Sequence, residues 1–256
     1  MEIDWGDGDY ARTARALAPA AEVLLDSASV TAGHSVLDVG CGTGNVALAA
    51  AARGAAATGV DPSARLVALA RERAARAGAD ARFLTGEAGR LPLPDGDFDA
   101  TLSAFAVIFA PDPAQALAEM VRVTRPGGAV ALTSWRSEGP IFAAGRILRE
   151  AFPSGDGAGP EPRWHDAAWV AEALGAAGAR DVRTTTAGLG YSAESPEAWL
   201  AEHEEHHPAW RWGRRTLGPG TWRGVRAQML AALHAGNEDR SAFRTRSHYL
   251  VAVAAR

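Results

Sequence analysis

The sequence predicts a doubly wound α/β fold, in which a mostly parallel sheet is covered by helices on both faces. Seven apolar stretches with strand character alternate with Ala- and Leu-rich stretches of helical periodicity. The first strand runs into three glycines at alternate positions, Gly40, Gly42 and Gly44. With 256 residues and 47% hydrophobic composition, the chain has enough apolar material for one large core.

Each element is assigned from its local pattern. A helix is expected at residues 9–28, and strands are expected at HSVLDVG, AAATGVD, ARFLTG, DFDATLSAF, GAVALTSW, ARDVRTTTAGL and the closing RSHYLVAVAAR. Between them, helices are expected at NVALAAAARG, SARLVALARERAARAG, DPAQALAEMVRVT and DAAWVAEALGAAG. The regular alternation predicts one domain over residues 1–256.

Two segments interrupt this alternation and are expected to be cap or lid insertions. Residues 136–164 are rich in glycine and proline and contain a short helix before the loop. Residues 191–245 separate the last two strands and contain four of the eight tryptophans, namely Trp199, Trp210, Trp212 and Trp222. Packing of the insertion and recognition of a ligand are both open interpretations of these tryptophans. The GPG sequence at 218–220 is a candidate hinge.

The composition excludes several functions. A net charge of -4 argues against a nucleic-acid groove or an anionic membrane surface as the main partner. The chain has no lysine, which excludes Schiff-base catalysis and a P-loop. Cys41 is the single cysteine, so a disulfide within the chain is excluded. The acidic stretch MEIDWGDGDY has no apolar segment of the kind found in secretion signals, and we expect a cytoplasmic protein.

The glycine-rich turn after the first strand predicts a ligand site. Glycine lets the backbone turn sharply and approach a ligand closely, and ligands of open α/β sheets bind at the carboxyl ends of strands. The dinucleotide pattern GxGxxG is absent, because Asn45 follows Gly44. Asp38, just before the loop, would repel a pyrophosphate and attract an ammonium or sulfonium group.

The second strand ends in Asp61, followed by Pro62 and Ser63 at a helix start. A carboxylate at this position can accept hydrogen bonds from both hydroxyls of a ribose. Asp61 could instead be only a helix N-cap. Together, the two elements predict a site for a nucleoside with a cationic chain.

At this point the sequence resembles the class I S-adenosylmethionine-dependent methyltransferases, in particular the group similar to ubiquinone- and menaquinone-biosynthesis methyltransferases. VLDVGCGTG, GVDPSARLVALA, LTGEAGRLPLPDGDFDATLSAF and RVTRPGGAVALTSW resemble successive family motifs across residues 30–135. The resemblance implies a Rossmann-like domain with a seven-stranded sheet and an antiparallel last strand. It also implies S-adenosylmethionine as cofactor, S-adenosylhomocysteine as product and methyl transfer to a small molecule.

The resemblance also implies roles for single residues. The three glycines would pass beneath the methionine portion with Cys41 as a small residue of the loop, Asp38 would lie near its amino group, and Asp61 with Pro62 would hold the ribose. Glu87 and the Ala88 main chain would read the adenine, although relatives usually have Asp at the position of Glu87. The carbonyl of Ser103 would accept from the ammonium group, and Tyr10 would cover the cofactor.

The methyl acceptor is expected to be small and fairly hydrophobic. Many relatives have a histidine after the fourth strand, where this chain has Ile108 and Phe109, so we expect an apolar pocket floor there. Candidate general bases are His165, His206 and His207, and Trp210 and Trp212 are candidate acceptor contacts.

We expect no metal. HEEHH places His203 and His207 one helical turn apart, but it lacks the HExxH order and predicts a solvated helix face. Nucleic acid and membrane are not expected as partners, and the chain is expected to be a monomer or homodimer. Two other functions stay open: a cofactor-bound enzyme that catalyses a cyclisation or rearrangement, and a cofactor-binding regulatory module without catalysis.

Overall fold

A computed structural model describes residues 3–152 and 162–256, which form two compact units. The first, here called the sheet unit, comprises Leu17–Ser134, Arg163–Ala187 and Tyr249–Arg256. The second, the helical unit, comprises the described parts of Met1–Ala16, Trp135–Pro162 and Gly188–His248. Residues 153–161, within the insertion expected at 136–164, lie outside the described residues.

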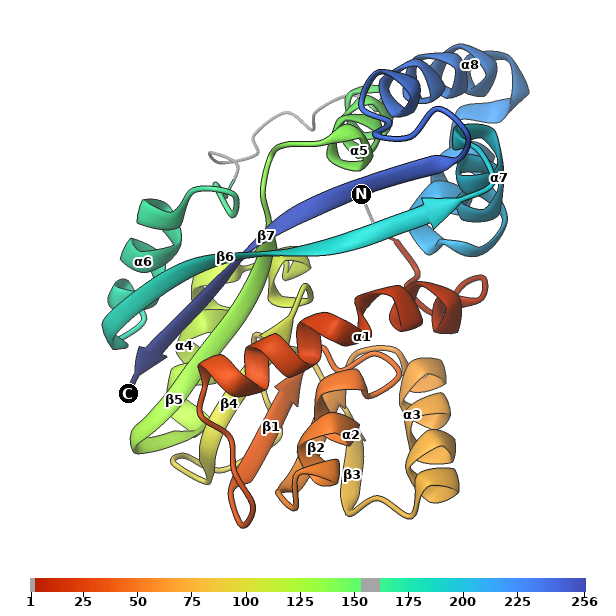
Figure 1. Ribbon diagram of the computed structural model, residues 1–256. Helices are drawn as coiled ribbons and strands as arrows, with labels where there is room; N and C mark the ends of the chain where they lie inside the picture. The colour runs from red at the N-terminus through yellow and green to blue at the C-terminus, as the bar shows by residue number, and fades with distance from the viewer. Residues whose placement is uncertain (1–2, 153–161) are drawn as a thin grey trace. The chain divides into compact units, whose positions relative to one another are not determined.

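Seven strands form one sheet in the order β3-β2-β1-β4-β5-β7-β6 (Figure 1). Their bounds are β1 Ser35–Val39, β2 Ala56–Asp61, β3 Ala81–Thr85, β4 Phe98–Ala104, β5 Thr124–Trp135, β6 Arg180–Ala193 and β7 Phe243–Ala255. The pairs β1–β2, β1–β4, β2–β3 and β4–β5 are parallel. The strand order reverses between β1 and β4, so this is the switch point at which an open α/β sheet binds its ligands.

The last strand, β7, runs antiparallel to its neighbour β5. The main-chain N–H of Arg136 donates to His248 O, and that of Arg256 donates to Gly128 O. As the residue number rises along β7, it falls along β5. The predicted doubly wound sheet with an antiparallel last strand is therefore confirmed.

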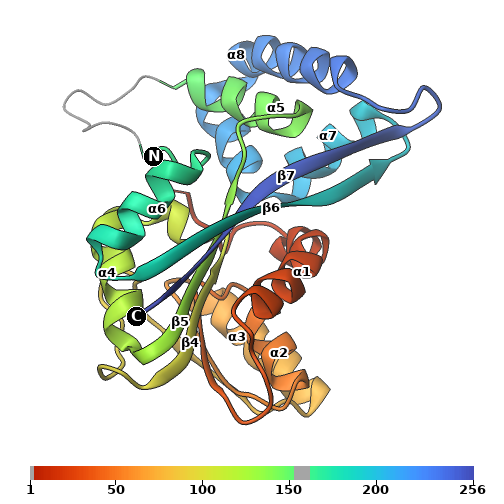
Figure 2. The ribbon, with the colours of Figure 1, turned by 60° about the vertical axis from the view of Figure 1, so that its left-hand side comes forward.

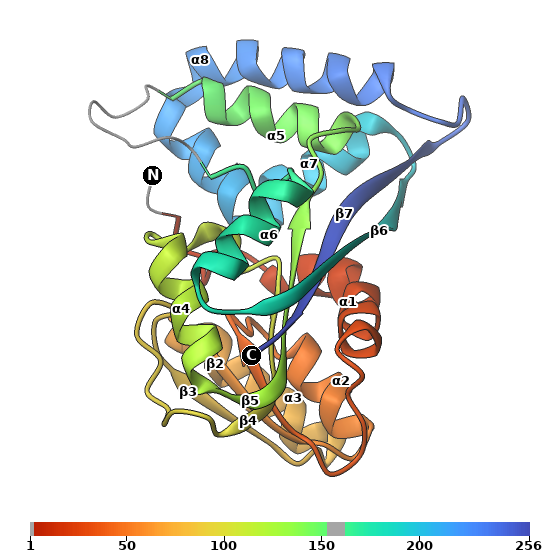
Figure 3. The same ribbon diagram turned by 90° about the vertical axis from the view of Figure 1, so that its left-hand side faces the viewer.

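Helices cover both faces of the sheet unit. Figure 3 shows α4 and α6 on one face and α2 and α3 on the other. This follows from the strand order, because right-handed crossovers that move in opposite directions from β1 place their helices on opposite faces. Among the described residues the α-helices are α1 Tyr10–Ser27, α2 Asn45–Ala52, α3 Ala64–Ala77, α4 Pro113–Val123, α5 Pro140–Glu150, α6 Ala167–Ala176, α7 Pro196–His206 and α8 Pro208–Ala235.

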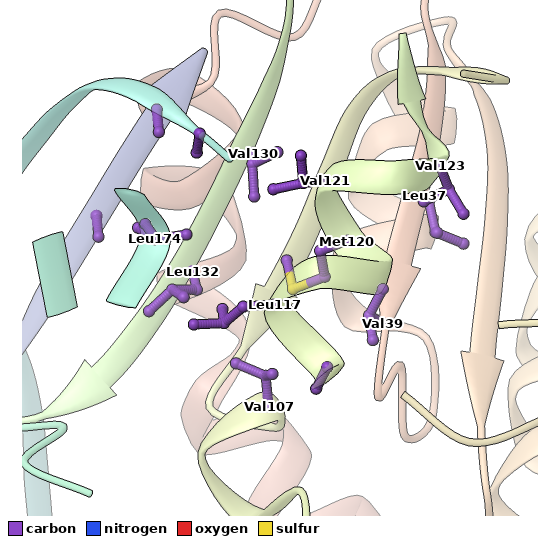
Figure 4. Close-up of a cluster of buried hydrophobic side chains, with 14 of the residues drawn as sticks. Leu37, Val39, Val107, Leu117, Met120, Val121, Val123, Val130, Leu132 and Leu174 are labelled. Carbon is purple, nitrogen blue, oxygen red and sulfur yellow. The ribbon is translucent and has the colours of Figure 1, made fainter. Parts of the chain in front are cut away.

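The main core lies between the sheet and α4 and α6. Figure 4 shows Met120 and Leu117 of α4 beside Leu132 and Leu174, in a cluster with Leu37 and Val39 of β1. Those two strand residues are fully buried because parallel strands are covered on both faces. This packing fixes the carboxyl end of β1, where the glycine loop begins.

The helical unit has a core of its own. In Figures 2 and 3, α5 lies beside α8. A Cβ on Gly213 would lie 2.6 Å from Leu148 Cδ1, so glycine allows these helices to approach closely. Trp199, Trp210 and Trp222 are 3–6% exposed in this core, which favours the packing interpretation for these three tryptophans.

The insertion between the last two strands is shorter than expected. Because β6 continues to Ala193 and β7 begins at Phe243, residues 194–242 connect them instead of 191–245. The GPG sequence interrupts α8, where Gly218 has φ +71° and ψ 167° outside the helical range. The position of the candidate hinge therefore coincides with a break in the helix.

The expected solvated face at HEEHH is wrong for His203 and His207. The His203 ring stacks on Trp199 at a centroid distance of 3.7 Å, and its Nδ1 donates to Trp199 O at 2.8 Å. His207 caps α8, with Nδ1 accepting from Ala209 N at 3.2 Å. Burial and the neighbouring His203 lower the pKa of His207 to about 3, so its ring is neutral at physiological pH.

No helix among the described residues combines the length and apolar character needed to cross a membrane.

The His207 cap predicts an acid-sensitive helical unit. In the unfolded chain His207 titrates near pH 6.5, and in the folded chain it titrates near pH 3, so folding stability falls as pH drops below about 6.5. Asn is also a good N-cap and does not titrate. Between pH 7 and pH 5 the wild type should lose about 2 kcal/mol more stability than His207→Asn.

Urea unfolding of both proteins at the two pH values measures this difference, and carboxylates that titrate in both proteins cancel. Equal losses would mean that His207 is not held neutral in the folded state.

Candidate functional site

The candidate site lies at the carboxyl ends of β1, β2 and β4, beside the switch point of the sheet. Main-chain hydrogen bonds tie these ends together. Gly40 N and Cys41 N both donate to Val60 O, at 2.8 and 3.0 Å, and Gly86 N donates to Asp61 O at 3.1 Å. The loops that follow the first three strands therefore form one connected surface.

The glycine loop needs glycine for two physical reasons. Gly40, Gly42 and Gly44 have φ of +69°, +53° and +86°, a region that residues with a Cβ rarely adopt. A Cβ on Gly40 would lie 2.2 Å from the Ala106 Cβ, and one on Gly44 would lie 2.9 Å from the ring of Phe83. The loop is thus both left-handed and closely packed.

Asp61 anchors the glycine loop to the start of α3. Its Oδ2 accepts from Gly42 N at 2.8 Å, and its Oδ1 accepts from Ser63 N at 2.9 Å. The interpretation of Asp61 as the N-cap is wrong, because Ser63 is the N-cap of α3 and accepts from Leu66 N. A carboxylate offers about four acceptor positions, so Asp61 retains capacity for ligand donors beyond these two amides.

Asp38 lies beneath the loop and is only 2% exposed. Its Oδ2 accepts from Ala47 N at 3.1 Å, in the first turn of α2. Burial, together with the charge of Asp61, raises the pKa of Asp38 to about 7. The carboxylate is therefore bound to the N-terminus of α2, where the helix dipole favours negative charge.

Three carboxyl groups, those of Asp38, Asp61 and Glu87, lie at this end of the sheet, and Asp38 with its pKa of about 7 is only about half ionised at neutral pH. Burial raises the pKa of Asp61, and the charge of the exposed Glu87 raises it further, against the effect of the two amides that donate to it. Asp61 in turn raises the pKa of Asp38. A cation in this region would relieve the repulsion, whereas a pyrophosphate would increase it.

The remaining predicted loop residues, Cys41, Pro62 and Ala88, differ in their burial. Cys41 is 6% exposed, and burial raises the pKa of its thiol, which fits a small loop residue and not a nucleophile. Pro62 is exposed, and Ala88 packs against the main core. Their proposed contacts with the cofactor stay predictions.

The end of β4 carries a strained residue and an apolar surface. Ser103 is fully buried, and its Oγ donates to Val39 O at 2.9 Å and accepts from Val107 N at 3.1 Å. Phe105 has φ +55°, unusual for a residue with a Cβ, and its N–H donates to Thr133 Oγ1. In the short helix Val107–Phe109 that follows, Ile108 packs on the core and Phe109 is 53% exposed.

The other predicted site residues are less directly connected to this surface. Tyr10, His206, His207, Trp210 and Trp212 belong to the helical unit, which the structure describes by itself. His165 is exposed in the sheet unit and precedes Asp166, the N-cap of α6. The roles of these six residues stay predictions.

Two polar side chains in the sheet unit were not predicted from the sequence. Arg73 of α3 donates to the glycine loop, and no local pattern distinguishes it from the other arginines of that helix. Trp164 is 9% exposed, and its Nε1–H has no hydrogen-bond partner among the described residues. Ser134 at the end of β5 donates to the Trp164 carbonyl at 2.6 Å.

The residues present fit a cationic nucleoside better than a dinucleotide. Left-handed glycines bring main chain to the site, the buried Asp61 offers acceptor capacity, and the neighbouring carboxylates favour positive charge. Within residues 3–152 and 162–256, no three His, Cys, Asp or Glu side chains gather so as to hold a metal ion.

Comparisons with known proteins agree with this geometry. Residues 37–132 match the family described as "Methyltransferase domain". An uncharacterized protein of Mycobacterium bovis is 37% identical over 173 residues, which cover 67% of this chain and 63% of that protein. The methyltransferase GfsG of Streptomyces halstedii is 36% identical over 134 residues, which cover 51% of this chain and 48% of that protein.

A solved structure shares the fold. The YcgJ protein of Bacillus subtilis matches with a TM-score of 0.65 and 20% identity, covering 93% of this chain and 98% of that chain. At this identity the likeness concerns the fold alone. The chain spans less than two thirds of the length of the curated relatives described above.

The packing around Gly44 predicts a large effect of a single methyl group. Gly44→Ala would incur the cost of a left-handed residue and a contact of 2.9 Å with Phe83. Gly78 is a matched control, because it has φ +59° and nothing within 4 Å of an added Cβ. Gly44→Ala should lower the melting temperature by roughly 3 to 8 °C more than Gly78→Ala.

Differential scanning calorimetry of the two variants gives this comparison. If both lose the same stability, Phe83 does not pack tightly against the glycine loop.

Proposed function

Because residues 37–132 belong to the methyltransferase-domain family and the fold is that of class I S-adenosylmethionine-dependent methyltransferases, we propose that this protein methylates a small, fairly hydrophobic metabolite. S-Adenosylmethionine is the cofactor, and S-adenosylhomocysteine is the product. We place the reaction in the cytoplasm, with the chain acting as a monomer or homodimer on neither nucleic acid nor membrane.

The observation that carries this proposal is the connection between Asp61 and the glycine loop at the switch point. Asp61 would hold the ribose, and Gly40, Gly42 and Gly44 would line the methionine portion, with Cys41 in the same loop. Glu87 and Ala88 would contact the adenine, with Pro62 nearby, and the Ser103 carbonyl and Tyr10 would complete the site. Asp38 supports this function through its bond to the N-terminus of α2.

The cofactor supplies an electrophilic methyl group on a cationic sulfur. The remaining requirement is alignment of the acceptor and exclusion of water, which rests on shape and apolar lining. Ile108 and the exposed Phe109, next to the strained Phe105, would supply such a surface at the end of β4.

A general base is needed only when the acceptor must lose a proton near neutral pH. His165, His206 and His207 are the candidates. His207 is the weakest of them, because its Nδ1 caps α8 and its pKa of about 3 makes it a poor proton acceptor at neutral pH. His165 and His206 are therefore the stronger candidates for a general base.

Thermal shift and product analysis test the function together. S-Adenosylhomocysteine should raise the melting temperature, and NAD should not, because the carboxylates disfavour its pyrophosphate. A panel of hydrophobic metabolites with methyl-labelled cofactor, followed by mass spectrometry, should yield a labelled product. Equal stabilisation by NAD contradicts the cofactor assignment, and a changed skeleton without methyl gain would indicate a cyclase.

Replacing Asp61 tests its contact with the cofactor. The ribose hydrogen bonds would be charge-assisted, each contributing on the order of 1.5 to 3 kcal/mol. Asp61→Ala should therefore weaken the affinity for S-adenosylhomocysteine at least about tenfold, measured by isothermal titration calorimetry.

Asp112→Ala is the matched control, because Asp112 caps α4 and accepts from Gln115 N at 3.0 Å. It should lower the melting temperature and leave the affinity unchanged. If Asp61→Ala binds S-adenosylhomocysteine as tightly as the wild type, Asp61 makes its two main-chain contacts and does not bind the ribose.

The insertion between β6 and β7, predicted at residues 191–245 and found at 194–242, is proposed to act as a lid and select the acceptor. Trp212 offers the sharpest test. Trp212 is half-buried beside Phe152, with a centroid distance of 4.5 Å, whereas Trp210 is only 6% exposed in the core. Trp212→Ala should lower kcat/KM for the acceptor at least about tenfold and leave cofactor affinity unchanged.

Trp210→Ala serves as the comparison, because truncation of a core tryptophan costs about 3 to 5 kcal/mol of stability. If Trp212→Ala lowers only the melting temperature and the folded fraction keeps its kinetics, the insertion is structural.

A further inference from the structure

Arg73 lies in α3, and its guanidinium reaches the glycine loop. Its Nη1 lies 2.6 Å from Thr43 O, 2.8 Å from Thr43 Oγ1 and 3.1 Å from Asn45 Oδ1. Because this nitrogen carries two hydrogens, the three acceptors share them in a bifurcated arrangement. The contacts fall on both sides of Gly44, which lies between the two residues.

Besides the bond from Gly42 N to Asp61, the segment that Arg73 contacts is a glycine-rich turn at the start of α2. Gly44 is the N-cap residue of α2, with φ 86° and ψ 31°, and it has no side chain to cap the helix. Glycines lose more conformational freedom on ordering than other residues, so a loop with three of them is costly to fix. A charged donor on the carbonyl of Thr43 and the side chain of Asn45 opposes that flexibility.

The same helix supports the loop by packing. A Cβ on Gly44 would lie 3.4 Å from the Ala70 Cβ and 2.9 Å from the ring of Phe83. Ala70 and Arg73 are one turn apart on α3, so they reach the loop from one side of that helix. α3 therefore acts on the loop through both contact and charge.

We propose that Arg73 is a positioning residue that holds the glycine loop in its cofactor-binding conformation before the cofactor binds. It acts through Thr43 and Asn45 and is not a catalytic residue. A loop already ordered in the free protein does not have to be ordered on binding, so the affinity for the cofactor rises. This inference rests on the proposed function of the glycine loop.

Substitution of Arg71 is the control that distinguishes positioning of the glycine loop from a general structural role of α3. Arg71 lies on the same helix and also donates to a main-chain carbonyl, with Nε at 3.2 Å and Nη2 at 2.6 Å from Phe83 O. That carbonyl belongs to β3 and not to the glycine loop. Arg71→Ala thus removes a comparable tie between α3 and the sheet without releasing Thr43 or Asn45.

Hydrogen exchange and calorimetry on the full chain test the proposal. In the ligand-free protein, Arg73→Ala should speed amide exchange in Gly40–Ala47 at least about fivefold, and Arg71→Ala should not. Arg73→Ala should also raise the Kd for S-adenosylhomocysteine about five- to tenfold, whereas Arg71→Ala should stay within about twofold of wild type. Once an acceptor has been identified, Arg73→Ala should raise KM for S-adenosylmethionine and leave kcat unchanged.

Arg73→Lys keeps the charge but loses the planar fork, so its Kd should lie between those of wild type and Arg73→Ala. Unchanged loop exchange in Arg73→Ala would overturn the proposal, as would equal effects of Arg73→Ala and Arg71→Ala on Kd. If the wild type fails to bind S-adenosylhomocysteine, the proposed function fails, and the exchange measurement on the free protein still decides the role of Arg73.

Discussion

The rest of the site depends on the two hydrogen bonds that the Asp61 carboxylate accepts from the main chain. The carboxylate sits at the end of β2 and accepts one amide from the glycine loop after β1 and another at the start of α3. One buried side chain therefore sets the position of the loop and the entry of a helix. Arg73 of α3 in turn donates to the Thr43 carbonyl in the glycine loop, so that the loop and α3 are linked both through Asp61 and through Arg73.

Electrostatics restrict what this arrangement can bind. The energetic cost of burying Asp38 and Asp61 near each other appears in the raised pKa of both carboxyl groups, and Glu87 adds to it for Asp61. Backbone amides donate to both buried carboxyl groups, and Asp38, with its pKa of about 7, is only partly ionised at neutral pH. The site therefore favours a ligand with positive charge and hydroxyl donors, and it disfavours the negatively charged pyrophosphate of a dinucleotide.

Local patterns predicted the alternation of strands and helices, whereas the antiparallel last strand was predicted from the resemblance to the methyltransferase family. The alternation of strand and helix segments and the glycines after VLDV place the sheet and its switch point, because these signals lie within a few residues of one another. Arg73 could not be found in this way, since its partners Thr43 and Asn45 lie in another element of the chain. The contacts of His203 and His207 were also missed, because HEEHH is polar in sequence. The stacking of His203 on Trp199 lies within one turn of α7, whereas the contact of His207 with Trp5 joins segments far apart in the chain. Phe105 gave no signal, as a left-handed φ is expected at glycine and not at phenylalanine.

Amide hydrogen exchange of the wild-type chain, with and without saturating S-adenosylhomocysteine, tests the central claim most directly. We predict slower exchange in the cofactor complex over residues 40–45, 61–63 and 87–88, because these segments would enclose the ligand together. Unchanged exchange in these three segments at saturation, or protection confined to other parts of the chain, would contradict it.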